Sequence, residues 1–111
     1  MSRRMVRVNK LLRAELSNLI LNEVKDPRIE SLLTVTEVDT SWDFKEAAVY
    51  VSIMGTVEEQ QSVLKGLNSA RGFMKFSLRD KLRLRYIPEL NFILDDSIER
   101  GARLSALIDQ V

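Results

Sequence analysis

The stretch Leu67-Asn68-Ser69-Ala70-Arg71-Gly72 stands in the middle of a helical pattern that runs from residue 57 to residue 82. Apolar residues recur at three- and four-residue spacing on both sides of it, which is typical of amphipathic helices. A glycine inside a helix costs about 1 kcal/mol relative to alanine, and such a residue often marks a break. We therefore predict two helices that meet at Ala70, Arg71 and Gly72.

Two strands are predicted before this helix pair. Residues 33–40 are rich in β-branched side chains, and residues 47–54 place Val49, Val51 and Ile53 on one face of a strand. The short connection between them predicts an antiparallel hairpin. The alternation slips between Val35 and Val38, which predicts a bulge in the first strand.

A third strand is predicted after the helix pair, because Leu90, Phe92 and Leu94 alternate behind Pro88. Helices are predicted at both ends of the chain. The first runs over residues 5–24, until Asp26-Pro27 ends it. The last begins at Asp95-Asp96-Ser97, which offers capping side chains, and continues to residue 108. The predicted order α-β-β-α-α-β-α describes one α+β domain over residues 1–111, a three-stranded sheet with helices on one face.

The composition excludes most kinds of catalytic site. The chain has 111 residues, with no cysteine and no histidine. It therefore has no disulfide, no ordinary zinc site, no Ser-His-Asp triad and no Cys-His pair. It also lacks a phosphate-binding glycine loop of the Walker type and any apolar stretch long enough to cross a bilayer. We expect a cytoplasmic protein that acts by binding, without a metal or a cofactor.

A net charge of +1 hides a segregated pattern of charges. Residues 1–13 carry five basic and no acidic groups, and residues 63–85 carry seven basic groups and one acidic group. Residues 14–62 carry three basic and ten acidic groups. Such blocks create strong local fields, although they can also be the solvated outer faces of helices, and charge alone favours that simpler interpretation.

The second basic block has a spacing that suits a nucleic acid. Arg71, Lys75 and Arg79 are four residues apart and line one helical face. A row of fixed cations matches a phosphate backbone, and Gly72 would let that backbone come close. Arg71 is the sharpest single candidate, since arginine also stacks on bases. The candidate RNA-binding residues are Arg3, Arg4, Arg7, Lys10, Lys65, Arg71, Lys75, Arg79, Lys81, Arg83 and Arg85.

Aromatic residues are few, and we expect them in the core. Recognition should then depend on the shape and backbone of the nucleic acid. Two other interpretations remain open. The acidic segment 14–62 could dock a basic protein, which would make the chain an adaptor. Asp95 and Asp96 could bind magnesium, but their place at a predicted helix start favours capping, and Glu58-Glu59 has the same explanation.

Beside a three-stranded sheet, a helix pair joined at a glycine-containing turn is how KH domains hold single-stranded RNA. Several short motifs stand in a fixed order along the sequence. They are Arg7-Val8, Asp26-Pro27-Arg28, Val35-Thr36-Glu37-Val38, Ala47 with Val49-Tyr50-Val51-Ser52, Leu67-Asn68-Ser69-Ala70-Arg71-Gly72, Leu84-Arg85-Tyr86-Ile87-Pro88-Glu89-Leu90-Asn91-Phe92 and Asp95-Asp96-Ser97. Each motif is weak alone, but from Arg4 to Val111 the ordered combination specifically resembles the ribosome-binding factor A family.

This resemblance implies a type II KH-like fold, in which an Ala-X-Gly kink at Ala70, Arg71 and Gly72 replaces the usual GXXG loop. It implies a non-enzymatic factor, linked to growth in the cold, that assists late maturation of the bacterial small ribosomal subunit. Such a factor binds the immature 30S particle and its 16S rRNA near the 5′ end, and leaves before translation begins. We expect a monomer that meets the small subunit, 16S rRNA and other assembly factors, but no membrane. Many members carry a basic C-terminal extension beyond the point where this sequence stops.

Overall fold

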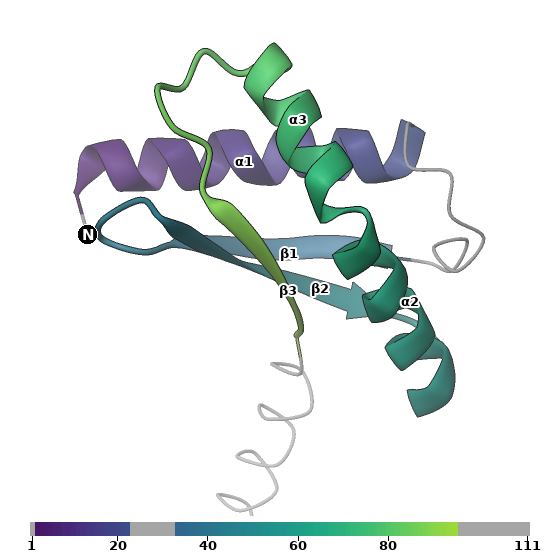
Figure 1. The fold of residues 1–111 in the computed structure, drawn as a ribbon. Coiled ribbons are helices and arrows are strands. Elements are labelled where there is room, and N and C mark those ends of the chain that lie inside the picture. Colours follow the sequence, from purple (N-terminus) through teal and green to yellow (C-terminus); the bar gives the residue numbers. More distant parts are fainter. Residues whose placement is uncertain (1, 23–32, 96–111) are drawn as a thin grey trace, which may run out of the picture.

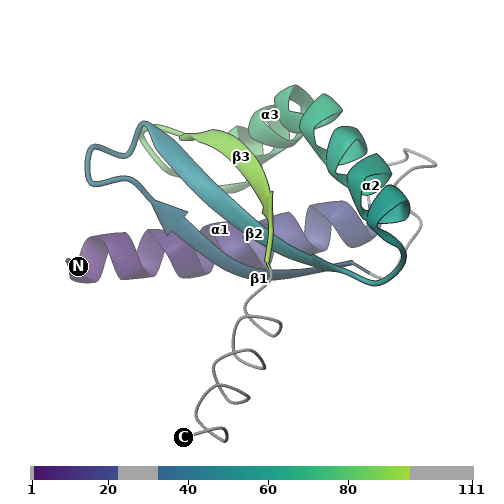
Figure 2. The same ribbon diagram turned by 90° about the horizontal axis from the view of Figure 1, so that it is seen from below.

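A computed structural model of the chain describes residues 2–22 and 33–95. Within these ranges, three helices lie on one face of a three-stranded sheet (Figures 1 and 2). This arrangement confirms the predicted α+β class. The elements are α1 (Arg3–Asn22), β1 (Leu33–Thr40), β2 (Glu46–Ile53), α2 (Val57–Ser69), α3 (Arg71–Lys81) and β3 (Glu89–Leu94). The predicted helix stop at Asp26-Pro27 and the predicted final helix lie outside the described residues.

The first two strands form the predicted antiparallel hairpin, with Thr40 opposite Ala47 near its tip. The register shifts between Val35 and Glu37, which confirms the bulge. One extra residue in β1 allows both Val35 and Val38 to face the helices, and both side chains are buried.

The third strand pairs with β2 in parallel, and β2 is therefore the central strand of the sheet. Parallel neighbours cannot be joined by a tight turn, because the chain must return to the end of the sheet at which β2 begins. The α2–α3 pair makes this return and covers the sheet as it does so (Figure 2). Pro88, which lacks a backbone N–H, lies buried just before β3 and takes no place in the ladder.

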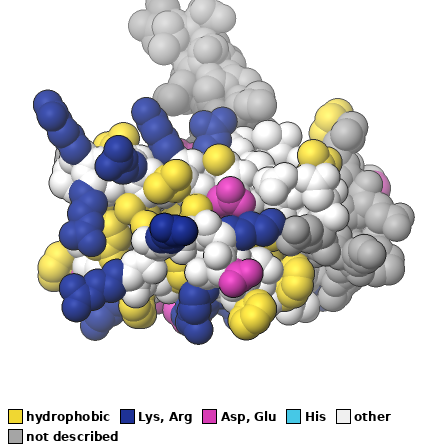
Figure 3. Space-filling view, turned by 90° about the horizontal axis from the view of Figure 1, so that it is seen from above, with side chains coloured by type: hydrophobic (Ala, Val, Ile, Leu, Met, Phe, Trp, Pro, Cys, Tyr) yellow, Lys and Arg dark blue, Asp and Glu magenta, His cyan; other side chains and the backbone are white. Residues whose placement is uncertain are grey.

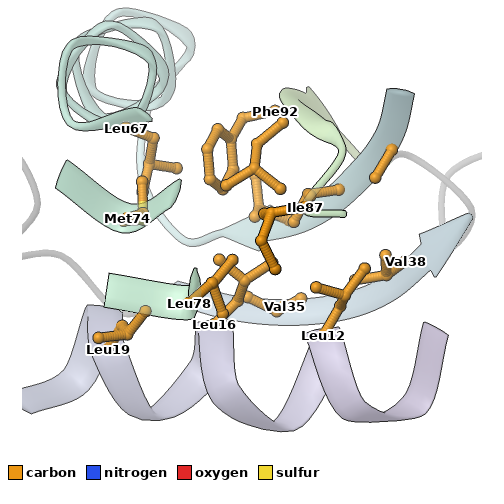
Figure 4. Close-up of a cluster of buried hydrophobic side chains, with 14 of the residues drawn as sticks. Leu12, Leu16, Leu19, Val35, Val38, Leu67, Met74, Leu78, Ile87 and Phe92 are labelled. Carbon is orange, nitrogen blue, oxygen red and sulfur yellow. The ribbon is translucent and has the colours of Figure 1, made fainter. Parts of the chain in front are cut away.

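The core lies between the helices and the inner face of the sheet. Figure 4 shows Leu12 and Leu16 of α1 pointing toward Val35 and Val38, with Met74 of α3 further along the same layer. Both leucines are fully buried, and burying a leucine stabilises a fold by roughly 2 kcal/mol. A hydrogen bond fixes α1 along the sheet, because the backbone N–H of Thr40 donates to Asn9 Oδ1 at 3.0 Å.

The turn from β2 into α2 depends on a glycine and a capping box. Gly55 has φ +136°, a conformation that side-chain-bearing residues rarely adopt. The next residue, Thr56, accepts a hydrogen bond from the backbone N–H of Glu59, and its own N–H donates to the Glu59 carboxylate, both at 3.1 Å. The backbone N–H of Thr56, followed by its hydroxyl, lowers the pKa of Glu59.

Replacing Gly55 by alanine should lower the free energy of unfolding by about 1–3 kcal/mol, because the new residue would be held in a glycine-only conformation. The added Cβ would also meet Glu59 Cβ at 3.2 Å. Urea unfolding followed by circular dichroism measures the change. The control is Gly72→Ala, in α3, where nothing lies within 4 Å of an added Cβ and where we expect a gain of up to about 1 kcal/mol.

Candidate nucleic-acid interface

The two crossover helices share a single residue at their junction. The Ala70 N–H donates to Gly66 O of α2 at 3.1 Å, and Ala70 O accepts from the Met74 N–H of α3 at 3.0 Å. Ala70 itself has φ −89° and ψ 3°, outside the helical values. The predicted pair of helices is confirmed, but the break falls on Ala70 alone. Gly72 lies inside α3 with open space beside it.

The outer side of α1 is basic near its N-terminus. Arg3, Arg7 and Lys10 share one side of α1 because they recur at three- and four-residue spacing, and all three are exposed. With the half-exposed Val6 and Leu11, they line an open hollow of about 420 Å³. The surface therefore combines cations with accessible apolar contact area.

Arg4 points elsewhere. Its guanidinium carbon lies 5.4 Å from the centroid of the Phe44 ring, at the tip of the β1–β2 hairpin. Phe44 has φ +61°, a left-handed conformation that the tip imposes on it. A cation above an aromatic face contributes about 0.5–1 kcal/mol at an exposed site. Arg4 thus connects α1 to the hairpin.

The second group of cations lies at the end of α3 and in the connection to β3. Arg79 and Lys81 occupy the last turn of α3, where basic residues interact favourably with the helix dipole. In the connection, Leu82 and Leu84 are partly buried against the core, and Arg83 and Arg85 alternate with them. Both arginines are exposed.

The two groups of cations meet on one surface because α1 and α3 are packed against each other. Figure 3, which looks down on these helices, shows Lys and Arg side chains gathered over them, with hydrophobic side chains between and few acidic ones. We call this surface the basic face. The name covers Arg3, Arg7 and Lys10 of α1, Arg79 and Lys81 of α3, and Arg83 and Arg85 of the connection to β3, all of which are exposed.

Besides Arg4, three further candidate residues are used or placed differently. Lys65 belongs to α2, a helix that lies away from the start of α1 (Figures 1 and 2). Arg71 donates from Nε to the Asn68 carbonyl oxygen at 3.1 Å, which satisfies a free carbonyl at the end of α2. Lys75 forms an ion pair with Glu89 at the start of β3. Its charge is therefore largely compensated within the protein.

This ion pair has a measurable consequence for Glu89. Its carboxylate accepts a hydrogen bond from the Lys75 ammonium, and this bond, followed by the Lys75 charge, lowers the Glu89 pKa; Arg71 adds a smaller effect. A carboxyl group whose pKa is lowered by folding stabilises the folded state when the pH is above its ordinary pKa. That stability is lost as the pH falls through the lowered pKa.

Lys75→Met should therefore bring the Glu89 pKa back toward its ordinary value, because both the hydrogen bond and the nearest charge are removed. NMR titration of the Glu89 side-chain carboxyl carbon measures this shift directly. The matched control is Arg79→Met, one turn further along α3, which should leave the Glu89 pKa unchanged. An equal shift in both variants would contradict a specific pair.

The expectation that the aromatic residues lie in the core is wrong for several of them. Phe73 is 49% exposed, Phe76 70%, Tyr86 54% and Trp42 85%. The reason is that α3 buries only a narrow stripe, Met74 and Leu78, and the two phenylalanines lie outside it. The sequence already indicated this exposure. Neither Phe73 nor Phe76 is three or four residues from Met74 or Leu78, so neither belongs to the buried side of the helix.

Two of the acidic side chains have local hydrogen-bond partners. Asp43 accepts hydrogen bonds from Ser41 Oγ at 2.7 Å and from the Lys45 N–H, and the Ser41 bond is the main cause of its lowered pKa. Glu59 belongs to the capping box. Both acids thus stabilise local turns instead of facing a partner as a group.

The magnesium alternative gains no support. Asp95 accepts a hydrogen bond from Thr36 Oγ1 at 2.5 Å, and Asp96 lies outside the described residues. Among residues 2–22 and 33–95, no group of three or more acidic, histidine or cysteine side chains could hold a metal ion. No helix in the same ranges is long and apolar enough to span a membrane.

Comparison with known proteins agrees with this geometry. A sequence model described as ribosome-binding factor A matches residues 4–108. Ribosome-binding factor A of Dehalococcoides mccartyi is 49% identical over 111 residues, which is all of this chain and 94% of that protein. The crystal structure of ribosome-binding factor A from Thermus thermophilus superposes with a TM-score of 0.72 at 29% identity, over 81% of this chain and 93% of that one.

A third match concerns an assembly. A homology model of the Thermus thermophilus protein, fitted into a cryo-EM map of a complex of 30S with ribosome-binding factor A, matches with a TM-score of 0.55 and 31% identity. It covers 75% of this chain and 90% of that one. The α+β fold, the basic face and these similarities define a small ribosome-binding protein. The chain belongs to the ribosome-binding factor A family.

Proposed function

We propose that this protein is an assembly factor that binds the immature 30S subunit through phosphates of its 16S rRNA. In this role it assists late maturation of the rRNA 5′ region. The observation that carries the proposal is the basic face, where cations of α1, α3 and the connection to β3 gather on one surface. Fixed cations in such a row bind a phosphate backbone and release its counterions.

The α2–α3 junction supports the same proposal. In KH domains a tight turn between two helices holds the backbone of four nucleotides. Here the turn is reduced to Ala70, and the following helix exposes Gly72 with no side chain to obstruct an approaching strand. We propose that this junction is the family's Ala-X-Gly kink and that it replaces the GXXG loop of a type II KH-like domain.

In the proposed role the protein acts by binding alone. Its sequence offers no histidine or cysteine for acid–base or nucleophilic chemistry, and the proposal requires no cofactor. The proposed setting is the cytoplasm, and the expected form is a monomer that meets other small-subunit assembly factors on the particle. A role in growth at low temperature belongs to the same proposal.

The double variant Arg83→Gln, Arg85→Gln should weaken binding to purified immature 30S particles. It should also reduce the slope of log affinity against log salt concentration by about one to two, since each lost phosphate contact removes slightly less than one unit. Both side chains are exposed outside helices and strands, so the fold should be unaffected. Sedimentation binding assays at several salt concentrations measure the slope.

The matched control is Lys65→Gln, which removes a cation of α2, a helix that lies away from the start of α1, and should leave the slope unchanged. Wild-type affinity that stays flat as salt is raised would refute phosphate contacts. Binding that survives RNase treatment of the particles would instead favour a protein partner, as an adaptor requires.

A further inference from the structure

Helix α3 exposes two large aromatic side chains that lie outside its buried stripe. Phe73 and Phe76 are 49% and 70% exposed, although burying a phenylalanine would stabilise the fold. The helix attaches to the core through Met74 and Leu78, which are fully buried on its inner side. The two rings are three residues apart and are therefore neighbours on the outer surface.

The surroundings of Phe76 are open in one direction. Helical spacing places Gly72, four residues before Phe76, on the same side of α3. Nothing lies within 4 Å of the place where a Gly72 Cβ would be. The missing side chain leaves bare helix beside an exposed ring, which is room for a flat group.

Phe76 has one basic and one acidic neighbour on the surface of α3. Arg79 lies three residues after Phe76, on a neighbouring position of the same surface, and it belongs to the basic face. Asp80 lies four residues after Phe76 and would repel a phosphate. A polyanion that crosses Phe76 should therefore pass on the Arg79 side.

We propose that Phe76 is a stacking platform for an unpaired RNA base, with Phe73 extending the apolar surface and Arg79 holding an adjacent phosphate. The inference rests on the proposed RNA-binding function and names the part of the RNA that α3 recognises. Exposed aromatic side chains inside a cationic surface are how proteins hold single-stranded RNA. A base needs a flat apolar face, space and a nearby cation, and this part of α3 supplies all three.

The first test compares Phe76→Leu with Phe76→Trp. Leucine keeps an apolar side chain but removes the aromatic face, whereas tryptophan keeps that face. We expect Phe76→Leu to lower affinity for immature 30S particles and for a single-stranded oligoadenylate about ten- to hundredfold. We expect Phe76→Trp to bind both as the wild type does. Because the Phe76 side chain is mostly exposed, unfolding midpoints should confirm that both variants remain folded.

The second test separates stacking from charge. Phe76→Leu should leave the salt slope of oligoadenylate binding unchanged, whereas Arg79→Gln should reduce it by about one. Inorganic polyphosphate, which has no bases, should bind the wild type and Phe76→Leu equally. Trp42 is the single tryptophan, so Phe76→Trp in a Trp42→Phe background places the indole at this position. Its fluorescence should be quenched by oligoadenylate and unaffected by polyphosphate.

Different failures have different meanings. If the wild type binds 30S particles, and Phe76→Leu binds 30S particles and oligoadenylate as tightly as the wild type does, stacking is refuted and the proposed function stands. Equal quenching of the indole at position 76 by oligoadenylate and by polyphosphate also refutes stacking. If the wild type does not bind 30S particles at all, the proposed function itself fails.

Discussion

The central strand β2 is the constraint on which the structure depends. It pairs with β1 on one side and with β3 on the other, and its inward side chains Ala47, Val49 and Val51 are fully buried. Each element therefore has its place defined relative to this strand. Helix α1 lies over β1, the α2–α3 pair returns the chain to the free edge of β2, and the two layers meet in one core (Figure 4).

This arrangement also explains why the cations gather. Two helices that pack side by side on one sheet face must turn their outer surfaces in the same direction. The buried stripes of α1 and α3 are used by the core, so the cations of both helices remain on the outside. Exposed cations cost the fold little, because water and salt screen their mutual repulsion. The exposed side of the helices can consequently be basic without any loss of apolar contacts in the core.

Elements with a strong local period were predictable from the sequence, including the bulge at Val35 and the helix pair. Properties that depend on distant partners were not. The parallel pairing of β3 follows from the path of the crossover, and the Lys75–Glu89 pair joins residues that only the fold brings together. The exposure of Phe76 could have been predicted from helical spacing, but hydrophobicity alone suggested burial. Which cations contact RNA depends on the partner's shape.

The parallel pairing of β2 with β3 has a further consequence, which concerns the time course of folding. The β1–β2 hairpin closes a short loop and can form early, whereas β3 can join only after the whole α2–α3 crossover has closed. Until then, the edge of β2 that will receive β3 is unpaired and can bind another extended chain. Concentrated refolding should therefore carry a risk of intermolecular pairing at this edge, and synthesis from the N-terminus exposes it until β3 has been made.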